Sequence, residues 1–263
     1  MFPPNFIPWV SFSKGSTLNR RKRPSTCYTA RATVHLEMGN INEAISDYNS
    51  AIELDPNNPS LYSARGDATA RQGQLQQSES DYREAIKLDP NSAKLYAGLG
   101  DILAQSGDLA GAIEEYGVAI RLDDQNANFL YDRGMIYAKD RKFEDAFRHI
   151  NMAIRLDPNN PKLQTVRGAS AGELGLHYQA IRSLSNAITL TPNKASLYID
   201  RATAYTVRGQ YAEAIGDYTA AIQLLPSTPT LFTDRGLVFV MMGNLYLAID
   251  DGLDALQVGQ ETA

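Results

Sequence analysis

The sequence of 263 residues contains a single cysteine, Cys27. One cysteine excludes an intramolecular disulfide framework and any zinc or iron–sulfur site built from several cysteines. The three histidines, His35, His149 and His177, show no metal-ligand spacing. No apolar run reaches the roughly 18 residues of a membrane-spanning helix, so we expect no membrane span.

Signatures of catalysis are also missing from the sequence. It has no phosphate-binding loop of the G-x-x-x-x-G-K-[ST] type, and no serine or cysteine nucleophile recurs with a base partner. We therefore expect no catalytic residues, no metal site and no cofactor, and the chain is not predicted to be an enzyme.

Acidic residues are absent from residues 1–27, which carry five basic side chains and a formal charge of +5. The whole chain has a formal net charge of −5, so residues 28–263 carry −10. Because phosphate contacts depend mainly on lysine and arginine, an acidic body of this kind argues against nucleic-acid binding by residues 28–263.

What the sequence does contain is an internal repeat of 34 residues. One row of small residues comprises Ala51, Ala85, Ala119, Ala153, Ala187, Ala221 and Ala255. A second row lies seven residues earlier and comprises Ala44, Ser78, Ala112, Ala146, Ala180, Ala214 and Ala248. The pattern defines seven units of equal length, 25–58, 59–92, 93–126, 127–160, 161–194, 195–228 and 229–262.

Each unit has the pattern of two helices joined by a tight turn. Apolar residues recur at spacings of three, four and seven, which indicates helices. A glycine such as Gly73 ends the first helix, and a proline such as Pro90 prevents the second from continuing. Helices of this kind approach closely only where side chains are small, so we predict fourteen antiparallel helices and no sheet.

A 34-residue helix–turn–helix unit with an aromatic start, rows of small residues and a closing proline resembles the tetratricopeptide repeat (TPR) family. The resemblance implies an all-α, right-handed superhelical solenoid whose concave groove is lined by the first helix of each pair, and a role in protein interaction. Local departures from the pattern are Leu130 and Gln164 at the aromatic start, Asp124 for a proline, Arg141 for the turn glycine, and Gly252 for a large residue.

An arginine recurs in six of the seven units, and a possible partner follows it sixteen residues later. The arginines are Arg31, Arg65, Arg133, Arg167, Arg201 and Arg235, and the residues that follow them are Asp47, Asp81, His149, Ser183, Asp217 and Asp251. Antiparallel helices place the two positions side by side. We therefore predict structural pairs within each repeat rather than a phosphate site, each contributing about 0–1 kcal/mol if partly exposed.

The concave side of the first helices, placed by the geometry of the family, is predicted to become apolar toward the C-terminal half. The predicted binding groove comprises Tyr131, Met135, Ile199, Val207, Leu237, Val240 and Met241, with Asp200 and Asp234 supplying polar contacts at its edge. Methionine and tyrosine are enriched at adaptable interfaces. The alternative that some of these side chains pack between neighbouring repeats stays open.

Residues 1–24 form a basic segment, containing proline and serine, outside the repeats. Three interpretations remain: a flexible tail, an organelle transit segment, or a nuclear signal or anionic-surface contact made by residues 20–23. The acid-free composition fits a transit segment, whereas Pro3, Pro4 and Pro8 oppose an amphipathic helix. We expect a cytoplasmic protein, or an organellar one if this segment directs import.

Two functions follow from the sequence. The first is a non-enzymatic scaffold that binds a partner protein or peptide in its concave groove. The second is a structural accessory subunit of a larger assembly or homodimer, in contact through an uncapped C-terminal end. The last helix carries Leu247, Ile249, Leu253 and Leu256, and exposed apolar residues there would favour self-association.

Overall fold

The structure is a computed structural model that describes residues 24–261, so the segment predicted at residues 1–24 lies outside the described residues apart from Pro24. The described part contains fourteen helices and no strand. The helices are α1 (Ser25–Glu37), α2 (Ile41–Leu54), α3 (Pro59–Arg71), α4 (Leu75–Leu88), α5 (Ala93–Ser106), α6 (Leu109–Leu122), α7 (Ala127–Lys139), α8 (Phe143–Leu156), α9 (Pro161–Glu173), α10 (His177–Leu190), α11 (Ala195–Val207), α12 (Tyr211–Leu224), α13 (Pro229–Met241) and α14 (Leu245–Glu261).

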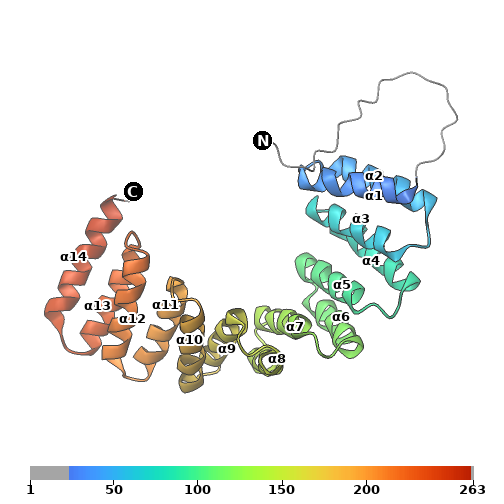
Figure 1. Ribbon diagram of the computed structural model, residues 1–263. Coiled ribbons are helices and arrows are strands. Elements are labelled where there is room, and N and C mark those ends of the chain that lie inside the picture. The colour runs from blue at the N-terminus through green and yellow to red at the C-terminus, as the bar shows by residue number, and fades with distance from the viewer. Residues whose placement is uncertain (1–23, 262–263) are drawn as a thin grey trace, which may run out of the picture.

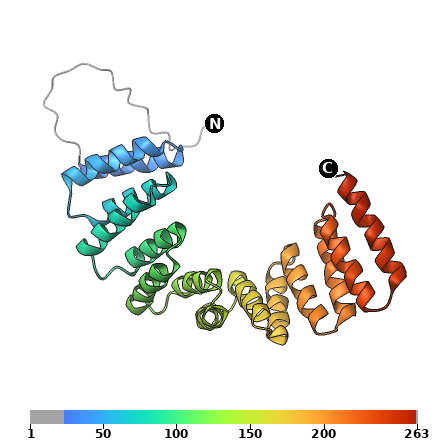
Figure 2. The same cartoon turned by 180° about the vertical axis from the view of Figure 1, so that it is seen from behind.

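The helices form seven consecutive antiparallel pairs that stack into a curved solenoid (Figure 1). Each helix packs against the next along the chain, and the first helices of neighbouring pairs also touch, as α3 with α5, α7 with α9, and α9 with α11. Seen from either side, the odd-numbered helices in the middle of the chain lie on the inner side of the curve (Figures 1 and 2). The predicted all-α solenoid of seven repeats is confirmed.

Six of the seven turns within the helix pairs contain a glycine in the left-handed region, with φ between 71° at Gly175 and 95° at Gly107. The fourth turn has Arg141 at the same position, with φ 59°. A side chain with a Cβ atom is disfavoured in this conformation, whereas glycine adopts it freely. The Arg141 guanidinium lies 5.9 Å from the centre of the Phe143 ring, which offsets part of that cost.

Replacing Arg141 with glycine is expected to stabilise the protein by about 0.5–1 kcal/mol, because the relief of backbone strain exceeds the lost cation–π contact. Urea unfolding followed by circular dichroism measures the change. The converse substitution, Gly175→Ala at the equivalent turn, should destabilise by about 1 kcal/mol. An Arg141→Gly variant less stable than wild type would show that Arg141 contributes more than the turn geometry indicates.

The small residues predicted at helix crossings are buried, as at Ala112 and Ala119, which are inaccessible to solvent. A methyl group built on Gly100 would lie 2.8 Å from the ring of Tyr116, which is closer than carbon atoms approach in practice. These crossings therefore have no space for a larger side chain. In the last repeat the equivalent residues, Ala248 and Ala255, are only half-buried.

In three of the units, the residue at the aromatic start bonds to the turn that precedes it. The Tyr62 hydroxyl donates a hydrogen bond to the Pro56 carbonyl at 3.0 Å, and Tyr198 bonds Pro192 at the same distance. Gln164, one of the departures from the pattern, donates its amide to the Pro158 carbonyl at 3.2 Å. The amide thus replaces the phenol in the same role.

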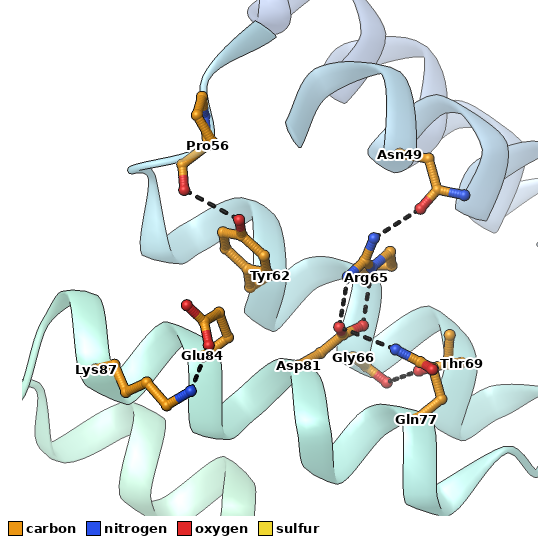
Figure 3. Close-up of polar contacts among 10 residues, drawn as sticks. All are labelled: Asn49, Pro56, Tyr62, Arg65, Gly66, Thr69, Gln77, Asp81, Glu84 and Lys87. Carbon is orange, nitrogen blue, oxygen red and sulfur yellow. Dashed lines mark hydrogen bonds and ion pairs between the residues drawn. The ribbon is translucent and has the colours of Figure 1, made fainter. Parts of the chain in front are cut away.

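The arginine row forms the pairs that the sequence predicted. Arg65 donates to both carboxylate oxygens of Asp81, from Nε at 2.9 Å and from Nη2 at 2.6 Å (Figure 3). The same fork joins Arg31, Arg201 and Arg235 to their aspartates, and Arg133 and Arg167 contact His149 and Ser183. These contacts confirm structural pairs within the repeats.

The carboxylates of these pairs are buried, so the pairs are not the partly exposed kind to which the predicted contribution of about 0–1 kcal/mol applies. The side chain of Asp81 is 3% exposed and that of Arg65 20%. A third nitrogen, Arg65 Nη1, donates to Asn49 of the preceding repeat at 2.8 Å (Figure 3). Arg201 and Arg235 reach back in the same way to Ser185 and Thr219, so the arginine row also joins neighbouring repeats.

Candidate functional site: the concave groove

The concave groove is lined by corresponding positions of consecutive first helices. In the second and third repeats, Asp67 and Arg71 of α3 face Gly98, Asp101 and Gln105 of α5 across a cavity of about 240 Å³. Positions 34 residues apart repeat this arrangement along the solenoid, which is how the predicted groove residues are placed below.

Asp200 and Val207, both of α11, line one cavity of about 410 Å³ between α9, α10 and α11. Three predicted residues lie on α13 of the last repeat, namely Leu237, Val240 and Met241. They occupy the positions that Asp67, Ala70 and Arg71 hold in the second repeat. Their exposed fractions are 55%, 49% and 58%. The structure thus places the C-terminal groove residues on two neighbouring first helices.

The other predicted residues are dispersed. Tyr131 lines a separate cavity with Asp132 and Lys162, and Met135 is exposed on α7. Ile199 is half-buried and packs between repeats, against the clusters that contain Tyr218 and Leu231. Asp234 is half-buried on α13. The nine predicted residues therefore do not form one continuous patch.

Sequence reasoning missed a second set of pairs on this face. The Tyr116 hydroxyl donates to Asp101 Oδ1 at 2.5 Å, and Tyr82 donates to Asp67 in the same way. Burial raises the pKa of both tyrosines, reinforced by the hydrogen bond to the aspartate, so the phenols remain protonated donors. The signal was a constant spacing of fifteen residues between aspartate and tyrosine.

Aspartates recur along the groove, and of these Asp132 and Asp234 are half-buried whereas Asp101 and Asp200 are exposed. Partial desolvation by the surrounding protein raises the pKa of Asp101, Asp200 and Asp234 above the ordinary value of 3.8. The pKa of Asp132 rises to about 6, because burial disfavours its charge, the negative charge of Asp101 adds to the effect, and Lys162 opposes it. Carboxylates in this state favour a cationic ligand over an anionic one.

The Asp132 carboxyl group should make stability depend on pH. Its pKa is higher in the folded chain, at about 6, than the ordinary value of 3.8, so its ionisation costs stability as pH rises through this interval. We expect Asp132→Asn to be more stable than wild type by about 1 kcal/mol at neutral pH, after allowance for its partial exposure. The difference should vanish near pH 4, and urea unfolding at both pH values measures it. A difference that stays constant with pH would contradict this assignment.

Neither a metal site nor a membrane segment stands out in residues 24–261. No group of three or more His, Cys, Asp or Glu side chains there is placed to hold a metal ion. None of the helices described is long and apolar enough to cross a bilayer.

Comparison with solved structures finds the same fold in several proteins. The C-terminal part of a TPR repeat-containing protein from Cytophaga hutchinsonii is 18% identical, with a TM-score of 0.76 over 88% of this chain and 95% of that one. MamA is 24% identical, with a TM-score of 0.63 over 64% of this chain and 92% of its own. YrrB, reported as a TPR protein with an unusual peptide-binding site, is 19% identical, with a TM-score of 0.60 over 68% of this chain and 92% of its own.

Family models match most of the repeats. The TPR repeat model matches residues 33–73, 66–107, 100–140 and 202–243, and the tetratricopeptide repeat model matches residues 127–160. No curated protein sequence matches the chain. Because the matched segments cover more than half of the sequence, this chain belongs to the tetratricopeptide repeat family.

Proposed function

We propose that this protein is a non-enzymatic scaffold that binds a segment of a partner protein in its concave groove. The observation that supports this most directly is the apolar group Leu237, Val240 and Met241 on α13. All three side chains are about half-exposed, at positions that line the groove in earlier repeats. Contiguous exposed apolar side chains mark interaction sites, and methionine adapts readily to a partner surface.

The fold supports the same proposal. A solenoid presents a long curved surface built from repeated helices, which suits the capture of an extended or helical segment. YrrB, which shares the fold, is reported to have a peptide-binding site. A peptide or protein partner is therefore the ligand class that we assign to this groove.

The test is capture of partners by the tagged protein, with mass spectrometry of what is retained. Val240→Ser/Met241→Ser should abolish capture and leave helicity unchanged by circular dichroism. The control is Met152→Ser/Leu156→Ser, which removes two exposed apolar side chains from α8, a second helix outside the groove. Unchanged capture by the groove variant contradicts the site, and lost helicity would show that Val240 and Met241 are core residues.

A second function, a structural subunit that docks through its C-terminal repeat, is favoured by α14. Leu245, Tyr246, Ile249, Leu253 and Leu256 on this helix are each 60–79% exposed. In the preceding repeat the position of Leu253 is held by Thr219, which accepts a hydrogen bond from the next arginine of the row. An apolar residue there suits an apolar partner surface.

Self-association through α14 is tested by sedimentation velocity over a range of concentrations. A monomer–oligomer equilibrium that Ile249→Gln/Leu253→Gln abolishes would support this function. A wild-type protein that stays monomeric, and that captures the same partners as the α14 variant, would contradict it.

A further inference from the structure

The cavity beside Asp200 lies where a tyrosine is missing. Tyr82 and Tyr116 occupy one position of the second helix in their repeats, and α10 has Leu184 there. The ring of Tyr82 extends to the first helix of the next repeat, where a methyl group built on Gly98 would lie 2.3 Å from it. Leu184 lacks the outer ring atoms and the hydroxyl, which leaves space beside Asp200, the residue equivalent to Gly98.

Small residues enlarge this space. Gly168, Ala169 and Gly172 of α9 line one side of the cavity, and nothing lies within 4 Å of a methyl group built on Gly172. Leu184 and Val207 supply apolar walls. The resulting volume is about 410 Å³, open to the concave face.

Two carboxyl side chains line the cavity. Asp200 and Glu173 both line it, no lysine or arginine does, and His177 is the only other titratable group among the lining residues. Asp200 makes no hydrogen bond or ion pair with residues 24–261. Burial raises its pKa and the charge of Lys194 only partly offsets this. A carboxylate that has no partner in the fold and stays accessible at the edge of the cavity can pair with a cation brought by a ligand.

We propose that this cavity receives an arginine or lysine side chain of the partner segment that the groove binds. The cationic head pairs with Asp200, and the aliphatic stem packs against Leu184 and Val207. The inference rests on the proposed function, and it adds that the partner carries a basic anchor residue rather than an acidic one.

The experiment is selection of a phage-displayed library of random 12-residue peptides on the full-length protein. Wild type should enrich arginine or lysine at one position, and Asp200→Asn should lose that preference. In a resynthesised peptide, glutamine at that position should weaken binding to wild type about tenfold, and binding to Asp200→Asn less than twofold. Glu84→Gln, which neutralises a carboxylate on α4 outside the groove, is the control and should keep the preference.

A second variant blocks the cavity without removing charge. Leu184→Tyr restores the residue found in other repeats, and Tyr218 beside Asp234 shows that the fold accepts this combination. Circular dichroism should be unchanged, and affinity for the selected peptide should fall at least tenfold. Full affinity in Leu184→Tyr would overturn the proposal.

The outcomes separate this inference from the proposed function. If selected peptides lose binding in Val240→Ser/Met241→Ser and yet show no preference for a basic residue, that result would overturn the inference and leave the groove function standing. An equal basic preference in Asp200→Asn would also overturn it. If no peptide is enriched, both are contradicted.

Discussion

Replacing Arg65 with methionine is expected to lower the free energy of unfolding by about 3 kcal/mol. The Asp81 carboxylate accepts two hydrogen bonds from Arg65 and is almost fully buried. Without the guanidinium its charge would stay in the interior with only Gln77 as a donor, at 3.3 Å. The variant also loses the bond to Asn49 that joins the first two repeats.

The matched control is Arg83→Met on α4. The side chain of Arg83 is 52% exposed and pairs with Glu79 at the surface, so its loss should cost less than about 1 kcal/mol. The double variant Arg65→Met/Asp81→Leu should recover much of the stability, because no unpaired charge remains. Urea unfolding measures all three. Equal losses for Arg65→Met and Arg83→Met would show that burial does not strengthen the row.

Replacing Ala119 with leucine is expected to destabilise the protein by about 1–3 kcal/mol, because three further carbon atoms must fit into a closed helix crossing. Ala119 is inaccessible to solvent and belongs to the largest apolar cluster, together with Leu99 and Tyr116. Interiors packed at this density cannot absorb the volume without displacing neighbouring side chains.

The control is Ala110→Leu, the same substitution on the exposed face of α6, where the change in helix propensity is small. Thermal and urea unfolding should move for Ala119→Leu and hardly move for Ala110→Leu. Equal midpoints for the two variants would contradict the close approach of the helices.

The arginine row matters for function because it sets how repeats sit against each other. In a solenoid each repeat contacts only its neighbours, so the shape of the groove is the sum of the local angles between repeats. Arg201 binds Asp217 in its own repeat and Ser185 in the preceding one. The same helix, α11, carries Asp200 and Val207 into the groove, so this contact orients the proposed site.

The repeat, the helix pairs, the turns and the partners of the arginines could all be predicted from the amino-acid pattern. These features depend on contacts between residues close in the chain. Because the 34-residue period has no insertions, all seven units align in the same register. Even the departures were correctly located. Arg141 occupies the position of a turn glycine, and Gln164 makes the hydrogen bond to a proline carbonyl that a tyrosine makes in other repeats.

How deeply each position is buried, and which groove residues lie together, depends on the packing of neighbouring repeats. Asp81 is only 3% exposed, which its spacing from Arg65 does not reveal. Ile199 packs between repeats, while Val207 lines a cavity. Such differences arise where two repeats meet, from the combined sizes of side chains on three helices. The cavity beside Asp200 is the clearest case, because it depends at once on Leu184, Gly168 and Gly172, and the spacing of any one row does not reveal it.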